Sequence, residues 1–139
     1  RARVAYQPLP ALGEGVANIF VDATMTTGAT AHLSFCPVAG AVVERACAHL
    51  RDHTLFLEVP MWAGFDAPGR LRHLERGRLV EEERGAEAEA FVQGGFAAEV
   101  AAFLDGVRAG RPLAPDLAES RQSLELAEVL RARREEFVA

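Results

Sequence analysis

Residues 16–36 read VANIFVDATMTTGATAHLSFC and contain the clearest fold signal in the chain. Two runs rich in β-branched, aromatic and other apolar residues, 16–26 and 29–36, flank the pair Thr27-Gly28. A Gly in a short connection between two such runs favours a tight turn. The segment therefore predicts two antiparallel strands joined as a hairpin.

The register of this hairpin is open between two alternatives, and a one-residue slip moves side chains to the opposite face. A two-residue turn places Met25 opposite Thr30 and mixes apolar with small polar groups on each face. A three-residue loop gathers one mainly apolar set, namely Ile19, Val21, Ala23, Met25, Ala31, Leu33 and Phe35. Its other face then holds Phe20, Asp22, Thr24, His32 and Ser34. Because even that face has little charge for a solvated sheet, we expect helices on one side and another chain or domain on the other.

Further strands are expected on both sides of the hairpin. Runs with strand character occupy residues 3–7, 41–50, 54–59, 71–75 and 78–83. Turn signals separate them at residues 8–15, at Arg51-Asp52 and at Arg76-Gly77. Residues 61–69 are predicted to form a loop. This order favours a mainly antiparallel sheet, because the alternation of strand and helix typical of parallel sheets is missing.

The apolar period becomes helical after Phe91. One stripe of a first helix would hold Phe96, Val100, Phe103, Leu104 and Val107, with Gly110 and Pro112 ending it. A second helix is expected from Asp116, with Glu119 completing a capping box and a buried stripe of Leu124, Ala127 and Leu130. The sequence thus predicts an α+β fold, with an open-faced antiparallel sheet, helices packed on one face and two helices at the carboxy terminus.

Composition limits the classes of function. The 139 residues suit a single domain, residues 1–139. The net charge is -5, and the basic residues are all Arg and are scattered along the chain, which argues against nucleic-acid binding. No apolar run approaches a membrane span and no secretion signal is present, so we expect a cytoplasmic protein with no membrane partner. Because the sequence starts at Arg1 rather than Met, we expect a processed product, an engineered fragment or part of a longer chain.

Few side chains suggest chemistry. The histidines, at positions 32, 49, 53 and 73, lack metal-ligand spacing, so no metal site is predicted. His32 and His49 could share a sheet face with Arg45 and contact a polar ligand, although a structural or interfacial role is favoured. Trp62 lies in a Gly/Pro-containing loop, and aromatic residues in such loops often line pockets or interfaces. A role in packing is the favoured alternative.

The two cysteines and the glutamates at positions 81–83 are predicted to have structural roles rather than chemical ones. Cys36 and Cys47 have no CxxC spacing and are expected to be small buried side chains rather than a disulfide or metal pair. The glutamates at positions 81–83 are expected to be a solvated run on an edge hairpin. Nucleophile-elbow, Walker and GxGxxG patterns are absent from the sequence, so no catalytic or cofactor-binding residue is assigned.

Residues 95–112, GFAAEVAAFLDGVRAGRP, followed by Asp116 and a helix containing SLELAE at 123–128, carry a family resemblance. This pattern resembles the end of the Gfo/Idh/MocA family, which comprises glucose-fructose oxidoreductase, inositol dehydrogenase and their relatives. The hairpin with its Gly28-Ala29 turn is similar to a hairpin of that family. The resemblance implies an open sheet that mediates homodimer or tetramer formation, paired with an amino-terminal Rossmann domain that binds NAD(H) or NADP(H).

The family transfers hydride to or from a sugar, cyclitol or related alcohol. Its Gly-rich fingerprint, its Glu-Lys-Pro segment and the histidine-bearing helix after it have no counterpart in this chain. The resemblance thus implies a carboxy-terminal domain that contributes pocket walls and an oligomer interface. We expect it to be inactive and to hold no cofactor by itself, with its Rossmann domain as partner and NAD or NADP in the parent enzyme. The alternative is a stand-alone small-molecule-binding α+β protein with a cavity of its own.

Overall fold

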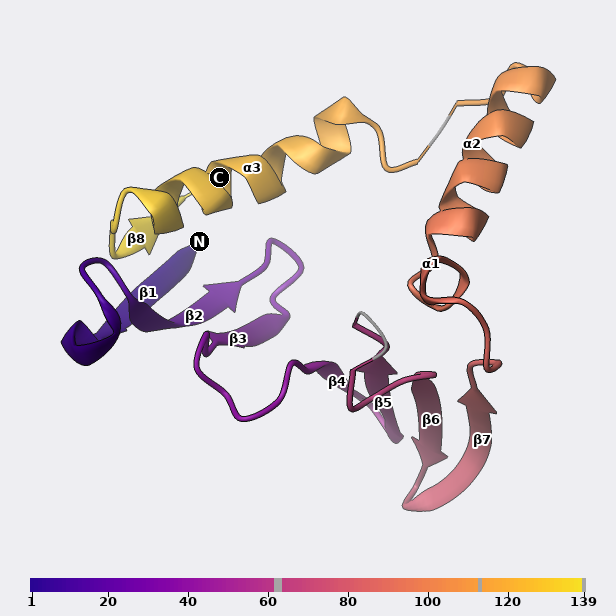
Figure 1. Ribbon diagram of the computed structural model, residues 1–139, viewed down its shortest axis with the longest axis horizontal. Coiled ribbons are helices and arrows are strands. Elements are labelled where there is room, and N and C mark those ends of the chain that lie inside the picture. Colours follow the sequence, from indigo (N-terminus) through magenta and orange to yellow (C-terminus); the bar gives the residue numbers. More distant parts are fainter. Residues whose placement is uncertain (62–63, 113, 139) are drawn as a thin grey trace. The chain divides into compact units, whose positions relative to one another are not determined.

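The computed structural model describes residues 1–61, 64–112 and 114–138. It confirms the α+β class: antiparallel strands come first and the two longest helices lie at the carboxy-terminal end. The chain divides into two compact units, one made of Arg1–Ala39 with Pro112–Ala139 and the other of Gly40–Arg111. Each unit contains one four-stranded antiparallel sheet (Figure 1).

The first unit is a sheet with one long helix. Its strand order is β3-β2-β1-β8. The strands are β1 (Ala2–Pro8), β2 (Ala17–Thr24), β3 (Thr30–Phe35) and the short β8 (Glu136–Phe137), and the helix is α3 (Leu117–Arg131). A 3-10 turn, Pro10–Leu12, lies in the loop between β1 and β2.

The hairpin of β2 and β3 has the register of the three-residue loop. Thr24 pairs with Thr30 and Val21 with Leu33. The amide of Met25 donates to the carbonyl of Ala29 at 2.8 Å, and Gly28 adopts a φ of 86°, which favours glycine. The apolar set of the hairpin therefore lies on one face and the set containing Phe20 and His32 on the other.

The core of the first unit lies between this apolar face and α3. It consists of Ala2, Val4, Val21 and Val129. The predicted start of α3 is confirmed, because the Asp116 side chain accepts from the Glu119 amide and the Glu119 carboxylate accepts from the Asp116 amide. Its predicted buried stripe is wrong in part: Leu124 and Ala127 are exposed, and Leu130 is half-buried. In α3, Val129 rather than Leu124 belongs to the core, with Leu130 packed against it.

The second unit is a four-stranded meander followed by helices. The strands pair in the order of the sequence: β4 (Glu44–Leu50), β5 (His53–Val59), β6 (Arg70–Glu75) and β7 (Arg78–Arg84). The turn at Arg76-Gly77 is as predicted, with both residues at positive φ. A short helix, α1 (Ala90–Gln93), precedes α2 (Phe96–Ala109), and Gly110 ends α2 in a left-handed conformation.

Two expectations about packing differ from the structure. The strands form two sheets instead of one, because the Pro- and Gly-containing segment between β3 and β4 has no strand pairing. The residues of the predicted apolar stripe do lie in α2, but they are not buried. Phe96 and Phe103 are each more than half exposed. Among the described residues, every buried large hydrophobic side chain belongs to the first unit. Within the described part of the chain, no helix combines the length and apolar character needed to cross a membrane.

Candidate functional site

The structure places two of the four predicted site residues on one face of the same sheet, without contact between them. Arg45 and His49 lie on β4 at positions that alternate onto the same face of the second unit's sheet. His32 lies on β3 in the first unit, where its Nδ1 is 2.5 Å from Asp22 Oδ1. His32 therefore belongs to a different sheet from Arg45 and His49. Trp62 lies outside the described residues.

Arg45 is anchored by a buried carboxylate. Its Nε and Nη2 donate to Asp66 Oδ2 and Oδ1 at 2.9 and 2.6 Å. The Asp66 side chain is only 4% exposed, whereas about half of the Arg45 side chain is exposed. The hydrogen bonds from Arg45 hold the pKa of Asp66 below its usual range, against the opposing effect of burial. The outer side of the guanidinium lies 5.9 Å from the ring centre of the exposed Phe65.

The loop that carries Asp66 is held against the end of β5 by Gly69. Gly69 has a φ of 90°, and a Cβ there would lie 2.8 Å from Pro60 Cδ and 3.1 Å from the Glu58 carbonyl oxygen. Both the conformation and the contact exclude a larger residue. Glycine at this position thus allows the close approach that brings Asp66 to Arg45.

Charged residues continue across the sheet from Arg45. The register places Arg45 opposite Glu58, Glu58 opposite Arg70, and Arg70 opposite Arg84. Arg70 donates to both carboxylate oxygens of Glu58, at 3.1 and 2.8 Å, and Arg72 adds a third bond at 3.3 Å. These bonds, chiefly those from Arg70, lower the pKa of Glu58.

These residues line a hollow of about 260 Å³, formed by Arg45, Glu58, Phe65, Asp66, Ala67, Pro68, Gly69, Arg70 and Arg84. Three guanidinium groups and two carboxylates face it. Both carboxylates already accept two or more charge-assisted bonds, which makes them poor bases. The hollow thus has one surplus positive charge, which suits a small anionic or polyhydroxyl group.

A second group of polar atoms lies farther along the same face of β4. His49 Nε2 is 3.3 Å from Cys47 Sγ, and His49 Nδ1 is 3.2 Å from Thr54 Oγ1. Both cysteines are exposed, so the prediction that they are buried is wrong. Cys36 lies just beyond the end of β3, and Cys47 lies on an edge strand of a sheet whose faces are largely uncovered. The alternation of Cys47 and His49 along one strand was the available signal for this group.

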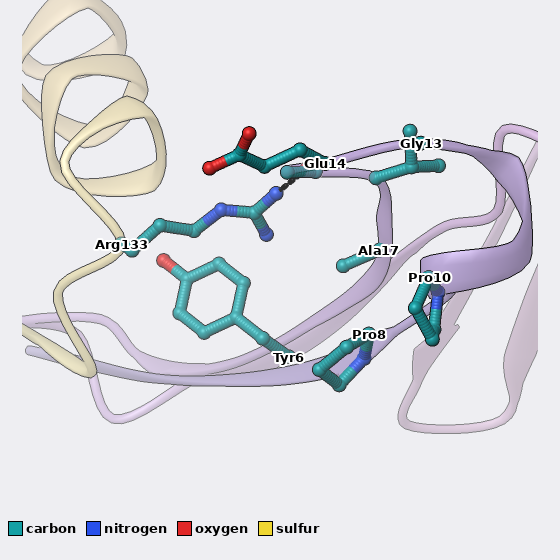
Figure 2. Close-up of a pocket in the computed structure, with 9 residues that line it drawn as sticks. Tyr6, Pro8, Pro10, Gly13, Glu14, Ala17 and Arg133 are labelled. Carbon is teal, nitrogen blue, oxygen red and sulfur yellow. Dashed lines mark hydrogen bonds between the residues drawn. The ribbon is translucent and has the colours of Figure 1, made fainter.

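The largest hollow described in the first unit, about 590 Å³, lies beside the loop after β1. Its lining is mainly apolar and consists of Tyr6, Pro8, Pro10, Gly13, Glu14, Gly15, Val16, Ala17 and Arg133. Figure 2 shows the Arg133 guanidinium over the Tyr6 ring, with Pro8 and Pro10 across the hollow.

Arg133 connects the segment after α3 to Tyr6 and to the loop between β1 and β2. It lies 4.9 Å from the Tyr6 ring centre and donates to the Gly15 carbonyl. Burial raises the pKa of Tyr6 and Arg133 partly opposes that effect, while the Tyr6 hydroxyl donates to the Arg134 carbonyl at 2.9 Å. Sequence reasoning missed Tyr6, because its partners follow α3 at the far end of the chain.

The two remaining histidines meet on the opposite face of the second sheet. His53 Nδ1 and His73 Nε2 are 2.9 Å apart, and His73 Nδ1 is 3.6 Å from a Glu81 carboxylate oxygen. Within residues 1–61, 64–112 and 114–138, no three His, Cys, Asp or Glu side chains are grouped to hold a metal ion.

The chain matches no protein-family model, and it matches no curated protein and no solved structure. The family resemblance therefore stays a hypothesis carried by the sequence motifs.

Proposed function

We propose that this chain is the carboxy-terminal domain of an NAD(P)-dependent oxidoreductase that acts on a sugar, cyclitol or related alcohol. In this proposal the domain supplies pocket walls and an oligomer interface. The nicotinamide chemistry belongs to a Rossmann domain elsewhere in the parent protein. The chain alone is expected to be inactive and to bind neither NAD nor NADP.

Exposed apolar surface is the observation that carries the proposal. Half of the residues are hydrophobic, yet the buried hydrophobic side chains of the described part are only Ala2, Val4, Ala17, Val21 and Val129. A domain of this composition ordinarily buries far more. Within each unit, the strands and helices of that unit leave much of this apolar surface uncovered, and the proposal assigns part of it to contacts with the Rossmann domain and with a second copy of the chain.

The fold class and the motif support that reading in part. The α+β class and the two longest helices at the carboxy terminus are what the resemblance implies, whereas the two four-stranded sheets differ from the single open sheet that it implies. The motif itself spans α2 and α3, residues 95–128. The hollow beside Arg45 supports a role in pocket formation, because a guanidinium fixed by a buried carboxylate is a suitable donor to substrate hydroxyl groups.

Light scattering together with a nicotinamide titration tests the proposal. The isolated chain should be a dimer, and the fluorescence of NADH or NADPH should be unchanged when it is added. Phe20, on the face of β2 away from α3, is the position for a disruptive Phe20→Glu variant, which should produce monomers. Leu12→Glu is the matched control, because Leu12 is exposed but lies off the sheet. A native chain that stays monomeric at high concentration, or that binds the dinucleotide, contradicts the proposal.

The alternative is a stand-alone small-molecule-binding protein, and the hollow beside Tyr6 favours it. A volume of about 590 Å³ falls in the range of ligand pockets, and the lining is mainly apolar with Arg133 as a polar anchor. Tyr6 is the only tyrosine, so a carbon label at its Cζ position alone gives a single resonance. A shift of that resonance with cyclic organic acids, in a monomeric chain, supports the alternative against the oxidoreductase proposal.

A further inference from the structure

We propose that Cys47, His49 and Thr54 form a nucleophilic thiol site that is modified by small carbon electrophiles. The proposal is independent of the oxidoreductase assignment, because all three residues lie on β4 and β5 of one sheet. It concerns a cysteine to which the sequence assigns no chemistry.

The strand geometry brings the three side chains together. Cys47 and His49 are two residues apart on β4, so they project from the same face. Thr54 is the residue of β5 directly opposite His49. The resulting chain of contacts runs from Cys47 Sγ to His49 Nε2 at 3.3 Å, and from His49 Nδ1 to Thr54 Oγ1 at 3.2 Å. Proteins activate thiols with this kind of arrangement, in which a base contacts the nucleophile and a third group orients the base.

Thr54 orients the imidazole through Nδ1, and Nε2 is the ring nitrogen next to the thiol. When Nδ1–H donates to Thr54 Oγ1, the lone pair of Nε2 faces the thiol of Cys47. Nε2 then accepts the thiol proton, and Sγ attacks the electrophilic carbon. An S–C bond forms while the bond from that carbon to the leaving group breaks, and the leaving group departs with the electron pair. His49 ends as imidazolium and passes its proton to solvent.

Charged side chains of both signs lie on the same face of the sheet as the thiol. They are Arg45 on β4, Glu58 on β5, Arg70 and Arg72 on β6, and Glu82 and Arg84 on β7. The Arg72 guanidinium lies 5.5 Å from the centre of the Phe56 ring, and Phe56 is the residue opposite Cys47. Glu58 accepts two bonds from Arg70 and one from Arg72. His49 is the group that contacts the thiol itself.

Cys36 provides an internal control. It is exposed like Cys47 but lies in the other unit. Among the described residues, no hydrogen bond to its thiol is present, whereas Cys47 has His49. A comparison of the two thiols in one molecule thus holds solvent, pH and reagent constant.

The experiment measures the rate of alkylation of each cysteine by iodoacetamide at pH 7 in the full 139-residue chain, by peptide mass spectrometry. An ordinary thiol is only a few per cent ionised at pH 7, so complete ionisation would raise the rate by at most about thirtyfold. Because His49 can take the proton from Cys47 and no such base contacts Cys36 among the described residues, we expect Cys47 to react about fivefold to tenfold faster than Cys36. Equal rates at the two cysteines would overturn the proposal.

Variants separate activation from simple exposure. His49→Gln should reduce the Cys47 rate to within about twofold of Cys36, because the base is lost. Thr54→Val should reduce it partly, and Thr54→Ser should restore it by keeping the hydroxyl. The circular dichroism spectrum reports whether each variant stays folded, and the Cys36 rate corrects for differences in reagent activity between samples. If Cys47 keeps its full advantage in the folded His49→Gln variant, His49 is not the base and the proposal is wrong.

Discussion

Arg45 and Asp66 are joined by two hydrogen bonds that bring a half-exposed guanidinium and a buried carboxylate together at the edge of the second sheet. The pair ties the loop after β5 to β4, across the mouth of the hollow that also contains Glu58 and Arg70. Loss of either partner should therefore affect the stability of the second unit and the shape of this hollow together.

Removal of the Arg45 charge should destabilise the chain, because it leaves the Asp66 carboxylate buried without its partner. Arg45→Met should lower the Tm, whereas Arg51→Met in the exposed turn after β4 should leave it nearly unchanged. The double variant Arg45→Met/Asp66→Asn should recover part of the loss, since a neutral amide is less costly to bury than an unpaired charge. Thermal unfolding followed by circular dichroism measures all three. A double variant less stable than Arg45→Met would contradict this account of the pair.

The acid dependence of stability follows from the lowered pKa values of Glu58 and Asp66. A group whose folded pKa lies below its unfolded value, about 4 for these carboxyls, stabilises the fold above that value. The free energy of unfolding should hence be steady above about pH 5 and fall as the pH drops through 4 and below. In urea titrations, Glu58→Gln should flatten this decline. Glu87→Gln, in the exposed loop before α1, should leave it unchanged, and an equal effect of both variants would refute the assignment.

The amino-terminal cap of α3 should contribute measurably to the first unit. Asp116→Ala removes the acceptor for the Glu119 amide and should cost about 1 kcal/mol, with a range of roughly 0.5–2. Gln122→Ala, an exposed position within the same helix, is the matched control and should change stability by less than about 0.5 kcal/mol. Urea unfolding followed at 222 nm measures both variants. Equal stabilities for the two would show that the capping box is not formed in solution.

The small core of the first unit should be sensitive to loss of volume at Val21. This side chain is 1% exposed and packs with Val4 and Val129. Val21→Ala should cost about 1–3 kcal/mol, through lost burial and the cavity left behind. Val138→Ala is the control, because Val138 is 72% exposed and should tolerate the change. A Val21→Ala variant as stable as the control would mean that α3 does not cover this face of the sheet.

Local patterns predicted the elements of the fold well. The alternating runs and turn residues located seven of the strands, and the capping residues located both long helices, since each signal depends on neighbours along the chain. The short α1, the 3-10 turn and the two-residue β8 were not predicted. The prediction of the α3 stripe failed because its contact surface depends on where the sheet ends, which places Val129 rather than Leu124 in the core.

Contacts between distant segments explain what was missed at the candidate sites. Arg45 could be singled out as a polar strand residue, but its partner Asp66 comes from a loop 21 residues away. Tyr6 and Arg133 are separated by almost the whole chain, and no local pattern connects them. His32 and His49 share residue type and strand context, yet pairing distributes them between two sheets.

We propose that this chain is the carboxy-terminal half of a nicotinamide-dependent oxidoreductase. Sequencing the natural reading frame upstream of the codon for Arg1 tests it most directly. The account predicts a βαβ unit bearing a GxGxxG fingerprint, followed by a Glu-Lys-Pro segment and a histidine-bearing helix that leads to Arg1. A start codon just before Arg1, with no open frame ahead of it, would contradict the claim.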